Sequence, residues 1–373
     1  MINVKKNVPE LRFPGFNDEW EEKKLGNICK IKKGQQLSKI SLNNFDKYPV
    51  INGGIRPSGY IDKYNKNENS IVISEGGASC GYVNFIKTKF WSGGHCYTLE
   101  ELKNIIIVEF LYQYLKFNEK RLSNLRVGSG LPNIQQKAIS SFEIMSPSLA
   151  EQQKIAAFLS AIDKKIEIVD KKIEYLESYK KGLMQKLLTG KIRFSGFNDE
   201  WKEEKLNEIF KNYNEKNKKH NYKQYTIGKN GIKLIDDIRY NISNHKTFKL
   251  NDLIIGIGIN EINLNINILN GCCSPIYTIY KIDEHILNPF FGYYYIPKKI
   301  YEYRNKITKI SSRRNFDIIH KDLLNLEIPF PSLQEQQKIA SFLSAVDKKI
   351  ELVTKKLENL KAYKKGLLQK MFV

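Results

Sequence analysis

Residues 147–186 read PSLAEQQKIAAFLSAIDKKIEIVDKKIEYLESYKKGLMQK, and residues 331–370 repeat this stretch as PSLQEQQKIASFLSAVDKKIELVTKKLENLKAYKKGLLQK. The offset is 184 positions, and 30 of the 40 aligned residues are identical. Apolar side chains recur in both copies at alternating spacings of three and four, which predicts a coiled-coil seam of about four heptads. A helix of this length would extend for about 60 Å.

The two helices are expected to pair with each other inside the chain, because each chain already holds two compatible seams. An antiparallel pairing would place the two globular parts at opposite ends of a pseudo-two-fold molecule, whereas pairing between chains would give a homodimer. Ser148 with Glu151, and Ser332 with Glu335, have the spacing of a capping box at each helix start. A lysine interrupts each seam at the same phase, which indicates either control of register or a local fray or kink. These lysines are Lys180 and Lys364.

A second repeat precedes each helix. LRFPGFNDEWEEKKLGNI at residues 11–28 returns as IRFSGFNDEWKEEKLNEI at residues 192–209, with an offset of 181. The stretches that follow, at about 29–142 and 210–326, are almost unrelated in sequence. This pattern predicts one scaffold with two different inserts. The expected boundaries are a first domain at 1–146, a first helix at 147–190, a second domain at 191–330 and a second helix at 331–373.

The composition narrows the class of protein. The chain has 373 residues, a hydrophobic fraction of 41% and a net charge of +21, which favours packed domains and an anionic partner such as nucleic acid. A biased genome composition would also enrich lysine. No apolar run approaches the roughly 18 residues of a membrane span, and no signal peptide is evident, so a cytoplasmic protein without membrane contact is expected. Five cysteines without CxxC spacing indicate free thiols, and no metal site or cofactor is predicted.

The paired PSLxEQQKIAxFL motifs, the LLTGKIRF junction at 187–194 and the two GFNDEW segments resemble the specificity subunits of type I restriction-modification systems. The resemblance covers essentially the whole chain. It implies a mixed α/β fold with two target-recognition domains joined by a long intramolecular antiparallel coiled coil. It also implies a subunit without catalysis of its own. Each domain would recognise one half of a bipartite, asymmetric site in double-stranded DNA.

The helices would then set the unread spacer and dock two methyltransferase subunits, which two restriction subunits would join. The seam residues assigned to helix pairing and subunit docking are Ile155, Leu159, Ile162, Ile166, Ile339, Leu343, Val346 and Ile350.

Three polar loops are candidates for DNA contact. The loop at 128–134 aligns with 312–318 in the second half, where two arginines precede an asparagine; both residue types can bind base edges in two places. A plain solvated turn is the alternative. The loops at 52–60 and 74–79 are supported by the resemblance. The predicted DNA-binding residues in these loops are Arg56, Ser58, Tyr60, Ser74, Ser79, Ser129, Asn133, Arg313, Arg314 and Asn315. Candidates for phosphate contact are Lys87, Lys89, Arg126, Lys229, Lys233, Arg239 and Lys246.

Two segments imitate enzyme motifs. Ile255–Gly258 resembles a fragment of a methyl-donor loop, and Asn288–Phe291 resembles the NPPF/Y motif of amino-methyltransferases, but the second proline is missing. A helix start, with Asn288 as N-cap and Pro289 at N1, explains the second segment more simply. No nuclease carboxylate pattern or nucleotide-binding loop is present. The remaining alternative to a specificity subunit is a free-standing DNA-binding or scaffolding protein, with a methyltransferase or nuclease as a third.

Overall fold

The structure is a computed structural model that describes residues 7–38, 42–128, 130, 132–218, 222–228, 231–236, 242–309 and 317–373. The chain divides into two compact units. Unit 1 contains residues 1–171 together with 355–373, and unit 2 contains residues 172–354. Both units draw on the two long helices, α5 (Leu149–Leu187) and α10 (Leu333–Met371). The unit boundaries therefore fall inside the helices, whereas the boundaries expected from sequence treat each helix as a separate segment.

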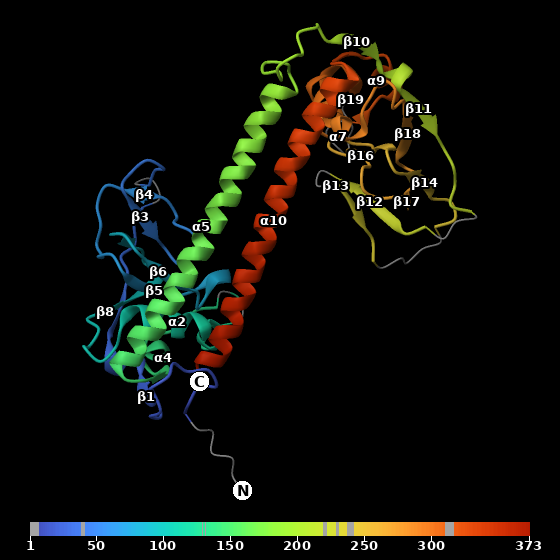
Figure 1. Cartoon of the computed structure of the whole chain (residues 1–373). Coiled ribbons are helices and arrows are strands. Elements are labelled where there is room, and N and C mark those ends of the chain that lie inside the picture. Colours follow the sequence, from blue (N-terminus) through green and yellow to red (C-terminus); the bar gives the residue numbers. More distant parts are fainter. Residues whose placement is uncertain are drawn as a thin grey trace. The chain divides into compact units, whose positions relative to one another are not determined.

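Unit 1 combines a four-stranded antiparallel sheet, in the order β2-β8-β5-β6, with a three-stranded sheet, in the order β4-β3-β7, and a two-stranded ribbon of β1 and β9 (Figure 1). Its strands are β1 (Glu21–Lys24), β2 (Lys30–Lys33), β3 (Tyr48–Ile51), β4 (Tyr60–Ile61), β5 (Ser70–Ser74), β6 (Val83–Ile86), β7 (Trp91–Ser92), β8 (Cys96–Glu100) and β9 (Glu143–Ser146). Its short helices are α1 (Leu25–Ile28), η2 (Gly77–Ser79), α2 (Val108–Phe117), α3 (Glu119–Ser123) and α4 (Gln136–Ser140).

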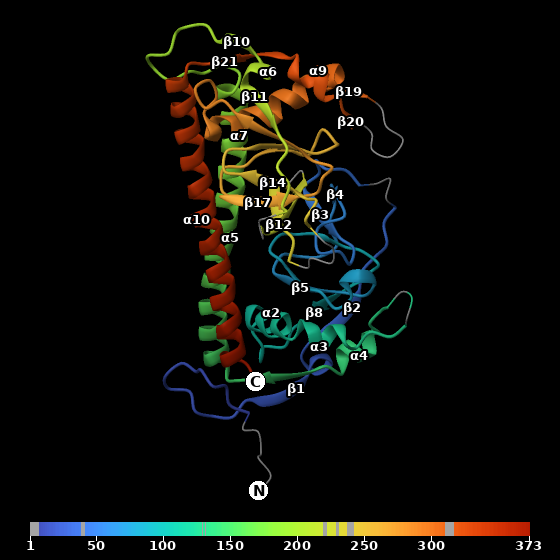
Figure 2. The same cartoon turned by 90° about the vertical axis from the view of Figure 1, so that its right-hand side faces the viewer.

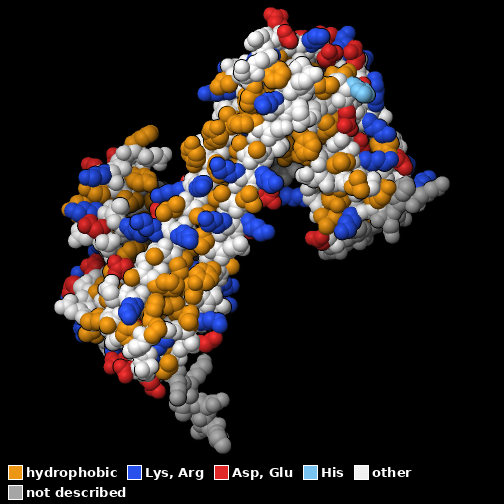
Figure 3. Space-filling view, viewed as in Figure 1, with side chains coloured by type: hydrophobic (Ala, Val, Ile, Leu, Met, Phe, Trp, Pro, Cys, Tyr) orange, Lys and Arg blue, Asp and Glu red, His pale blue; other side chains and the backbone are white. Residues whose placement is uncertain are grey.

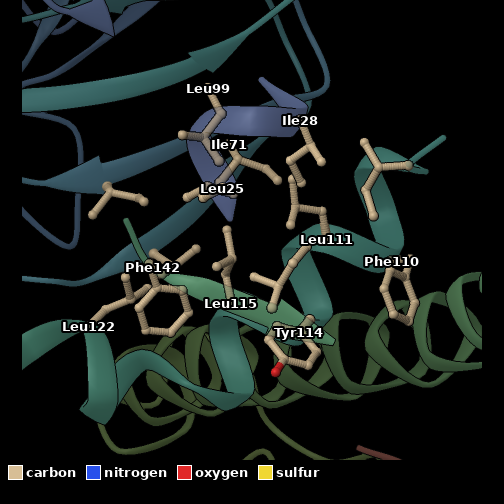
Figure 4. Close-up of a cluster of buried hydrophobic side chains, with 14 of the residues drawn as sticks. Leu25, Ile28, Ile71, Leu99, Phe110, Leu111, Tyr114, Leu115, Leu122 and Phe142 are labelled. Atoms are coloured by element: carbon tan, nitrogen blue, oxygen red, sulfur yellow. The ribbon is translucent and has the colours of Figure 1, made fainter. Parts of the chain in front are cut away.

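Strand β5 lies between two layers of apolar side chains in unit 1. Its run of apolar residues is buried on both faces, as expected for a strand at the centre of a packed domain. Ile71 and Ile73 join the main core with α2 and the helix ends, while Val72 packs on the other face with Ile51 and Phe90. Figure 4 shows the main core, in which side chains of α1, α2 and the central sheet meet.

Unit 2 is built in the same way. Its central sheet has the order β11-β18-β15-β16, a second sheet has the order β13-β12-β17-β14, and β10-β21 and β19-β20 form two ribbons. Its strands are β10 (Lys202–Lys205), β11 (Phe210–Tyr213), β12 (Gln224–Gly228), β13 (Gly231–Leu234), β14 (Lys246–Lys249), β15 (Leu253–Ile255), β16 (Ile262–Leu264), β17 (Asn270–Cys273), β18 (Thr278–Ile282), β19 (Thr308–Lys309), β20 (Asp317–Ile318) and β21 (Glu327–Phe330). Its helices are α6 (Leu206–Ile209), α7 (Pro289–Glu302), α8 (Arg304–Ile307) and α9 (His320–Leu324).

The central sheets of the two units correspond strand for strand. The order β2-β8-β5-β6 in unit 1 matches β11-β18-β15-β16 in unit 2, and the ribbon β1-β9 matches β10-β21. This agreement holds although the sequences at about 29–142 and 210–326 are almost unrelated, because the buried pattern and not the residue identity specifies the sheet. The predicted mixed α/β class with two similar domains is confirmed.

Within each unit, α5 and α10 lie side by side and antiparallel (Figures 1 and 2). In unit 1, the beginning of α5 packs against the end of α10 in a shared core that includes Leu159 and Met371. In unit 2, the end of α5 packs against the beginning of α10, where Leu187 and Leu343 share a core. The predicted intramolecular antiparallel coiled coil is therefore confirmed. Both helices continue without interruption through the two seam lysines, so these positions are not helix breaks.

A buried ion pair ties the start of each long helix to the repeated segment at the beginning of its unit. Arg12 donates from Nε and Nη2 to the two carboxylate oxygens of Glu151, both at 2.7 Å, and Arg193 binds Glu335 in the same way at 2.9 and 2.7 Å. The two glutamates are 0% and 1% exposed. A planar guanidinium supplies two parallel charge-assisted hydrogen bonds to a carboxylate, which compensate its burial.

This pairing changes the predicted capping boxes. The serine half is confirmed, because the backbone N–H of Glu151 donates to Ser148 Oγ at 3.4 Å and that of Glu335 donates to Ser332 Oγ at 3.4 Å. The prediction was wrong for the glutamate side chains, since they bind the arginines instead of turning back to the serine backbone. The arginine offers a charged fork, which is a stronger partner than one amide.

The next residue of each motif, a glutamine, satisfies backbone groups of the neighbouring loop. Gln152 accepts from the N–H of Ile107 at 2.9 Å and donates to the carbonyl of Ile105 at 3.1 Å. Gln336 accepts from the N–H of Asn288 and donates to the carbonyl of Ile286. Gln152 and Gln336 are both buried, so the glutamate and the first glutamine of the EQQ motif are explained by the polar groups that the fold must satisfy beneath the helix start.

Candidate nucleic-acid interface

Three loops of unit 1 that are far apart in sequence meet around one surface cavity of about 550 Å³. The first loop follows β3, the second follows β5 and the third precedes α4, and their described residues belong to the predicted stretches at 52–60, 74–79 and 128–134. The backbone N–H of Gly77 donates to the carbonyl of Pro132 at 3.1 Å, and that of Ile134 donates to the carbonyl of Glu75 at 2.8 Å. The lining residues are Lys33, Asn52, Gly53, Gly54, Glu75, Gly76, Gly77, Ala78, Ser79, His95, Pro132 and Asn133.

Serine side chains hold two of these loops together. Ser74 and Ser79 both donate their hydroxyl groups to the carbonyl oxygen of Gly53. Gly53 has a φ of +84°, and a Cβ at this position would lie 2.6 Å from the carbonyl oxygen of His95. The tight approach requires glycine here, and it keeps this wall of the cavity free of side chains.

Glu75 is a charged residue in the lining of the cavity. Its Oε1 accepts hydrogen bonds from Lys33 Nζ at 2.6 Å and from the Tyr97 hydroxyl at 3.1 Å. Burial, followed by the hydrogen bond to Glu75, raises the pKa of Tyr97 to about 12, so this hydroxyl is a donor at neutral pH. The side chain of Glu75 is 15% exposed. The carboxylate is thus held in place and still reaches the cavity.

The predicted residues of these loops take three positions. Ser79 and Asn133 line the cavity, as does Asn52 from the first loop. Ser74 lies beneath it and is 3% exposed, so it supports the loop. Ser58 lines a neighbouring cavity of about 300 Å³ that also includes Asn52.

Arg56 is exposed on the segment between β3 and β4, and Tyr60 is exposed at the start of β4. The structure therefore gathers the three predicted loops into one surface.

The three predicted phosphate contacts of unit 1 do not line either cavity. Lys87 is exposed and lies 3.5 Å from Glu167 of α5. Lys89 donates to the Tyr64 hydroxyl at 3.1 Å and lies over the ring of that tyrosine. Arg126 is exposed at the start of the loop that leads to Asn133.

Unit 2 carries the counterpart of this loop cluster. The segment after β15, residues 256–258, occupies the place of the segment after β5, because the N–H of Ile318 donates to the carbonyl of Ile257 at 3.0 Å and Gly258 bridges to Asp317. In unit 1 the matching interactions join Ile134 to Glu75 and Gly76 to Asn133. The glycines that imitate a methyl-donor loop belong to this cluster.

Several predicted residues lie outside the described residues: Ser129, Lys229, Arg239, Arg313, Arg314 and Asn315. Of the other two candidates in unit 2, Lys233 is exposed on β13, while Lys246 donates to the carbonyl of Tyr277 at 2.6 Å.

Sequence reasoning missed Lys33, Glu75 and His95 as members of the cavity. Glu75 lay within a segment that the sequence singled out, next to Ser74. Since Ser74 continues the buried run of β5, the first residue after it was the one to consider for solvent contact. Lys33 and His95 come from strand ends β2 and β8, and their place beside β5 requires knowledge of the sheet order.

The predicted seam residues are mostly covered by the chain itself. Ile155, Leu159, Ile339, Leu343 and Val346 are all buried. Ile162, Ile166 and Ile350 are partly buried. On the face shown in Figure 3, lysine and arginine side chains gather together with apolar side chains over the long helices.

Apart from Leu149 and Leu333 at the helix starts, the large apolar side chains exposed on these helices lie beside the seam: Ile168, Tyr175, Tyr179, Leu352 and Tyr363.

The features that imitate enzyme motifs have structural explanations. Asn288 Oδ1 accepts from the N–H of Phe291 at 3.0 Å and caps α7, with Pro289 in its first turn, as predicted. The five cysteines are free and buried, as expected for unpaired thiols. No group of three or more potential metal-binding side chains occurs among the described residues. None of the helices in that part of the chain combines the length and the apolar character that crossing a membrane requires.

The fold thus defines a protein of two similar α/β modules that share one helical frame and each present a loop cluster after the central strand. The family description "Type I restriction modification DNA specificity domain" matches residues 17–178 and 198–362. The chain therefore belongs to this family, and the prediction of a type I restriction-modification specificity subunit is confirmed.

Two specificity subunits match over nearly their whole length. The MjaVIII type I restriction enzyme specificity subunit of Methanocaldococcus jannaschii is 26% identical, over 97% of this chain and 93% of the relative. A putative type I specificity subunit of Mycoplasma genitalium is 26% identical over 98% and 96%. The crystal structure of a type I restriction-modification S subunit from M. genitalium has a similar fold, with a TM-score of 0.70 at 22% identity, over 98% and 99% of the two chains.

Proposed function

We propose that the protein recognises a bipartite, asymmetric site in double-stranded DNA, with one half-site bound by the loop cluster of each unit, and that it has no catalytic activity of its own. The observation that carries this proposal is the duplicated loop cluster. Equivalent backbone hydrogen bonds hold Glu75 and Ile257 at the same place in the two units, yet the side chains there differ. A conserved frame with different groups at the surface is what recognition of two different half-sites requires.

The electrostatics agree with DNA as the partner. A net charge of +21 favours association with a polyanion, and the exposed lysines and arginines that are not engaged in ion pairs are available for phosphate contact. Arg56 and Arg126 are exposed in unit 1 at two of the loops that frame the cavity. Phosphate contacts of this kind position a protein on DNA, and base contacts in the cavity would supply the specificity.

The long helices are proposed to set the spacer between the half-sites. Each contains 39 residues, or about 58 Å of continuous helix. Removal of one heptad from both helices, in register, would shorten the frame by about 10 Å and keep the seam intact. We expect the spacer to change by about three base pairs, at about 3.4 Å per base pair, while both half-sites stay the same.

The same helices are proposed to dock two methyltransferase subunits. The seam residues are mostly covered by the chain, so docking would use the exposed apolar side chains beside the seam. Two pairs of these recur at equivalent positions of the repeat: Ile168 with Leu352, exposed by 58% and 61%, and Tyr179 with Tyr363, exposed by 44% and 57%. Equivalent apolar groups on two helices suit two copies of one partner. Restriction subunits would then join this core complex.

The decisive experiment is methylome sequencing of cells that express the chain together with a methyltransferase subunit of a type I restriction-modification system. A motif of two short blocks around a fixed gap is expected. Exchange of residues 29–142 for the corresponding insert of a relative should change one block and leave the other. No methylation, or one continuous motif, would favour a free-standing DNA-binding or scaffolding protein. Purified chain incubated with DNA and methyl donor alone should transfer no methyl groups, and transfer would contradict the non-catalytic role.

A further inference from the structure

Glu75 and Ile257 occupy the same position in the two units but offer opposite chemistry. Each is the first or second residue after the central strand of its sheet, and each carbonyl accepts from the isoleucine N–H that follows the bridged loop, at 2.8 and 3.0 Å. Glu75 presents a carboxylate, which only accepts hydrogen bonds when it is ionised. Ile257 presents an apolar side chain. The same backbone thus delivers two different surfaces.

The groups around Glu75 orient its carboxylate so that it can accept a hydrogen bond from a ligand. Lys33 and Tyr97 both donate to Oε1, so these contacts orient the group without using Oε2. Both donors bind Oε1 and Glu75 lines the cavity, so Oε2 is the oxygen that this inference assigns to the ligand. A carboxylate without such support would retreat into solvent, away from the phosphate charge of DNA. Lys33 offsets that repulsion.

The cavity around Glu75 is open to a flat ligand edge. Gly53, Gly54, Gly76 and Gly77 contribute backbone without side chains to its lining. At Gly76 a Cβ would lie 3.2 Å from the carbonyl oxygen of Pro132, so even a methyl group would crowd this wall. A volume of about 550 Å³ is ample for the edge of a base pair in a groove.

We propose that Glu75 is a specificity-determining residue of the first half-site, and that its carboxylate accepts a hydrogen bond from the exocyclic amino group of cytosine or adenine. Guanine O6 and thymine O4 are acceptors at the corresponding place in the major groove and would be repelled. At the equivalent position of the second half-site, Ile257 favours an apolar contact such as the thymine methyl group. This inference rests on the proposed recognition of DNA by the two units.

The test uses the complex of the full chain with its methyltransferase and DNA duplexes in which one half-site is randomised. We expect Glu75→Ala to relax one base position of the first half-site, lowering its preference for C or A from roughly 10- to 100-fold to near 1. The second half-site should be unchanged. Glu75→Gln, which keeps the shape and adds an N–H donor, should admit guanine or thymine at that position, because the amide can donate to guanine O6 or thymine O4.

Glu143→Gln is the matched control, because Glu143 is exposed on β9 and does not line the cavity. A Glu75→Gln complex that methylates with an unchanged motif would overturn the proposal. If the Glu75→Ala variant does not assemble, the motif of the Glu75→Gln complex shows whether Glu75 determines specificity. The insert exchange at 29–142 distinguishes a failure of the Glu75 assignment from a failure of DNA recognition by unit 1. If that exchange alters the motif while the Glu75 variants do not, only the assignment of Glu75 fails. If the exchange leaves the motif unchanged, recognition by unit 1 fails altogether.

Discussion

Lys364, at a seam position of α10, donates to Asp163 of α5 across 2.6 Å within unit 1. The repeat produces the same pair in unit 2, where Lys180 of α5 lies 2.5 Å from Asp347 of α10. Each aspartate also accepts from the globular part of its unit, Asp163 from Gln113 at 2.7 Å and Asp347 from the Tyr294 hydroxyl at 2.6 Å. One carboxylate therefore connects three elements, and it favours the register-control interpretation of the seam lysines over a fray or kink.

The seam pair should be stabilising only while both charges are present. We expect Asp163→Ala to lower the free energy of unfolding by about 1–2 kcal/mol, since Lys364 then stays in the seam without a partner. Adding Lys364→Leu should recover the part of the loss that comes from the unpaired lysine, because leucine completes the apolar row, while Gln113 stays without its acceptor. Urea unfolding followed by circular dichroism measures both. Asp170→Ala, at an exposed position of α5, is the control. Additive losses in the double variant would contradict this account.

Removal of one partner should cost more stability in the buried arginine–glutamate pairs than in the lysine–aspartate pairs of the seam. In Arg12→Met, Glu151 remains fully buried without its counter-charge, which should cost about 3–5 kcal/mol. The double change Arg12→Met with Glu151→Leu should recover most of this loss. Hydrogen exchange at the start of α5 would report the effect locally. Lys24→Met, at an exposed position of β1, removes the same charge as a control. Equal protection in Arg12→Met and the control would argue against the ion pair as the anchor.

Asp252 should make the stability of unit 2 depend on pH. Its side chain is 4% exposed, and burial raises its pKa to about 6, although Oδ2 accepts from the N–H of Lys249 at 2.6 Å. The folded state therefore binds a proton that the unfolded state has released, so stability falls as pH rises from about 4 to 6. The expected loss is about 3 kcal/mol.

Asp252→Asn should remove this pH dependence and raise stability at pH 8, because the amide oxygen can still accept from Lys249. Urea unfolding measured between pH 4.5 and 8 tests both statements. Asp236→Asn, at an exposed position, serves as the control. A wild-type profile as steep as that of Asp252→Asn would show that Asp252 is not the source.

The docking surface on the helices can be tested with its two equivalent tyrosines. Tyr179→Glu and Tyr363→Glu each introduce a charge on an exposed ring site, and each should weaken binding of a methyltransferase subunit by about tenfold or more. Calorimetric titration of the purified chain with methyltransferase measures the affinity. Glu358→Ala is the control, since it lies five positions before Tyr363, about 140° around the helix. Wild-type affinity in the variant with both tyrosines replaced would exclude this surface.

The features that depend on a periodic or repeated pattern could be predicted from the sequence. The seam, the helix starts and the duplicated plan follow from apolar spacing and from repeated motifs. The partner of Glu151 was not predictable, because Arg12 lies 139 residues away and no local pattern links the two. A long-range ion pair depends on how the modules fold back on the helix.

The candidate site was only partly predictable for the same reason. The glycine-rich and polar loops at 52–60, 74–79 and 128–134 are visible in the sequence, yet their meeting depends on the sheet order. Ser74 and Glu75 illustrate the difference: both are polar and adjacent, but the end of β5 places one below the surface and the other at it. The buried run ends with Ser74, the last residue of β5 that pairs with β8, and the sequence does not reveal where that pairing stops.

The division of the long helices between the units has a consequence for synthesis on the ribosome. Unit 1 contains the first domain but also residues 355–373, and Phe372 packs among Trp20, Phe110 and Tyr114 in its core. Unit 1 therefore cannot complete its core until residues 355–373 have been translated. Part of its apolar core stays uncovered while the second domain is translated. Unit 2, which is one continuous stretch from 172 to 354, can complete its own core earlier. The order of folding is thus expected to be the reverse of the order of translation.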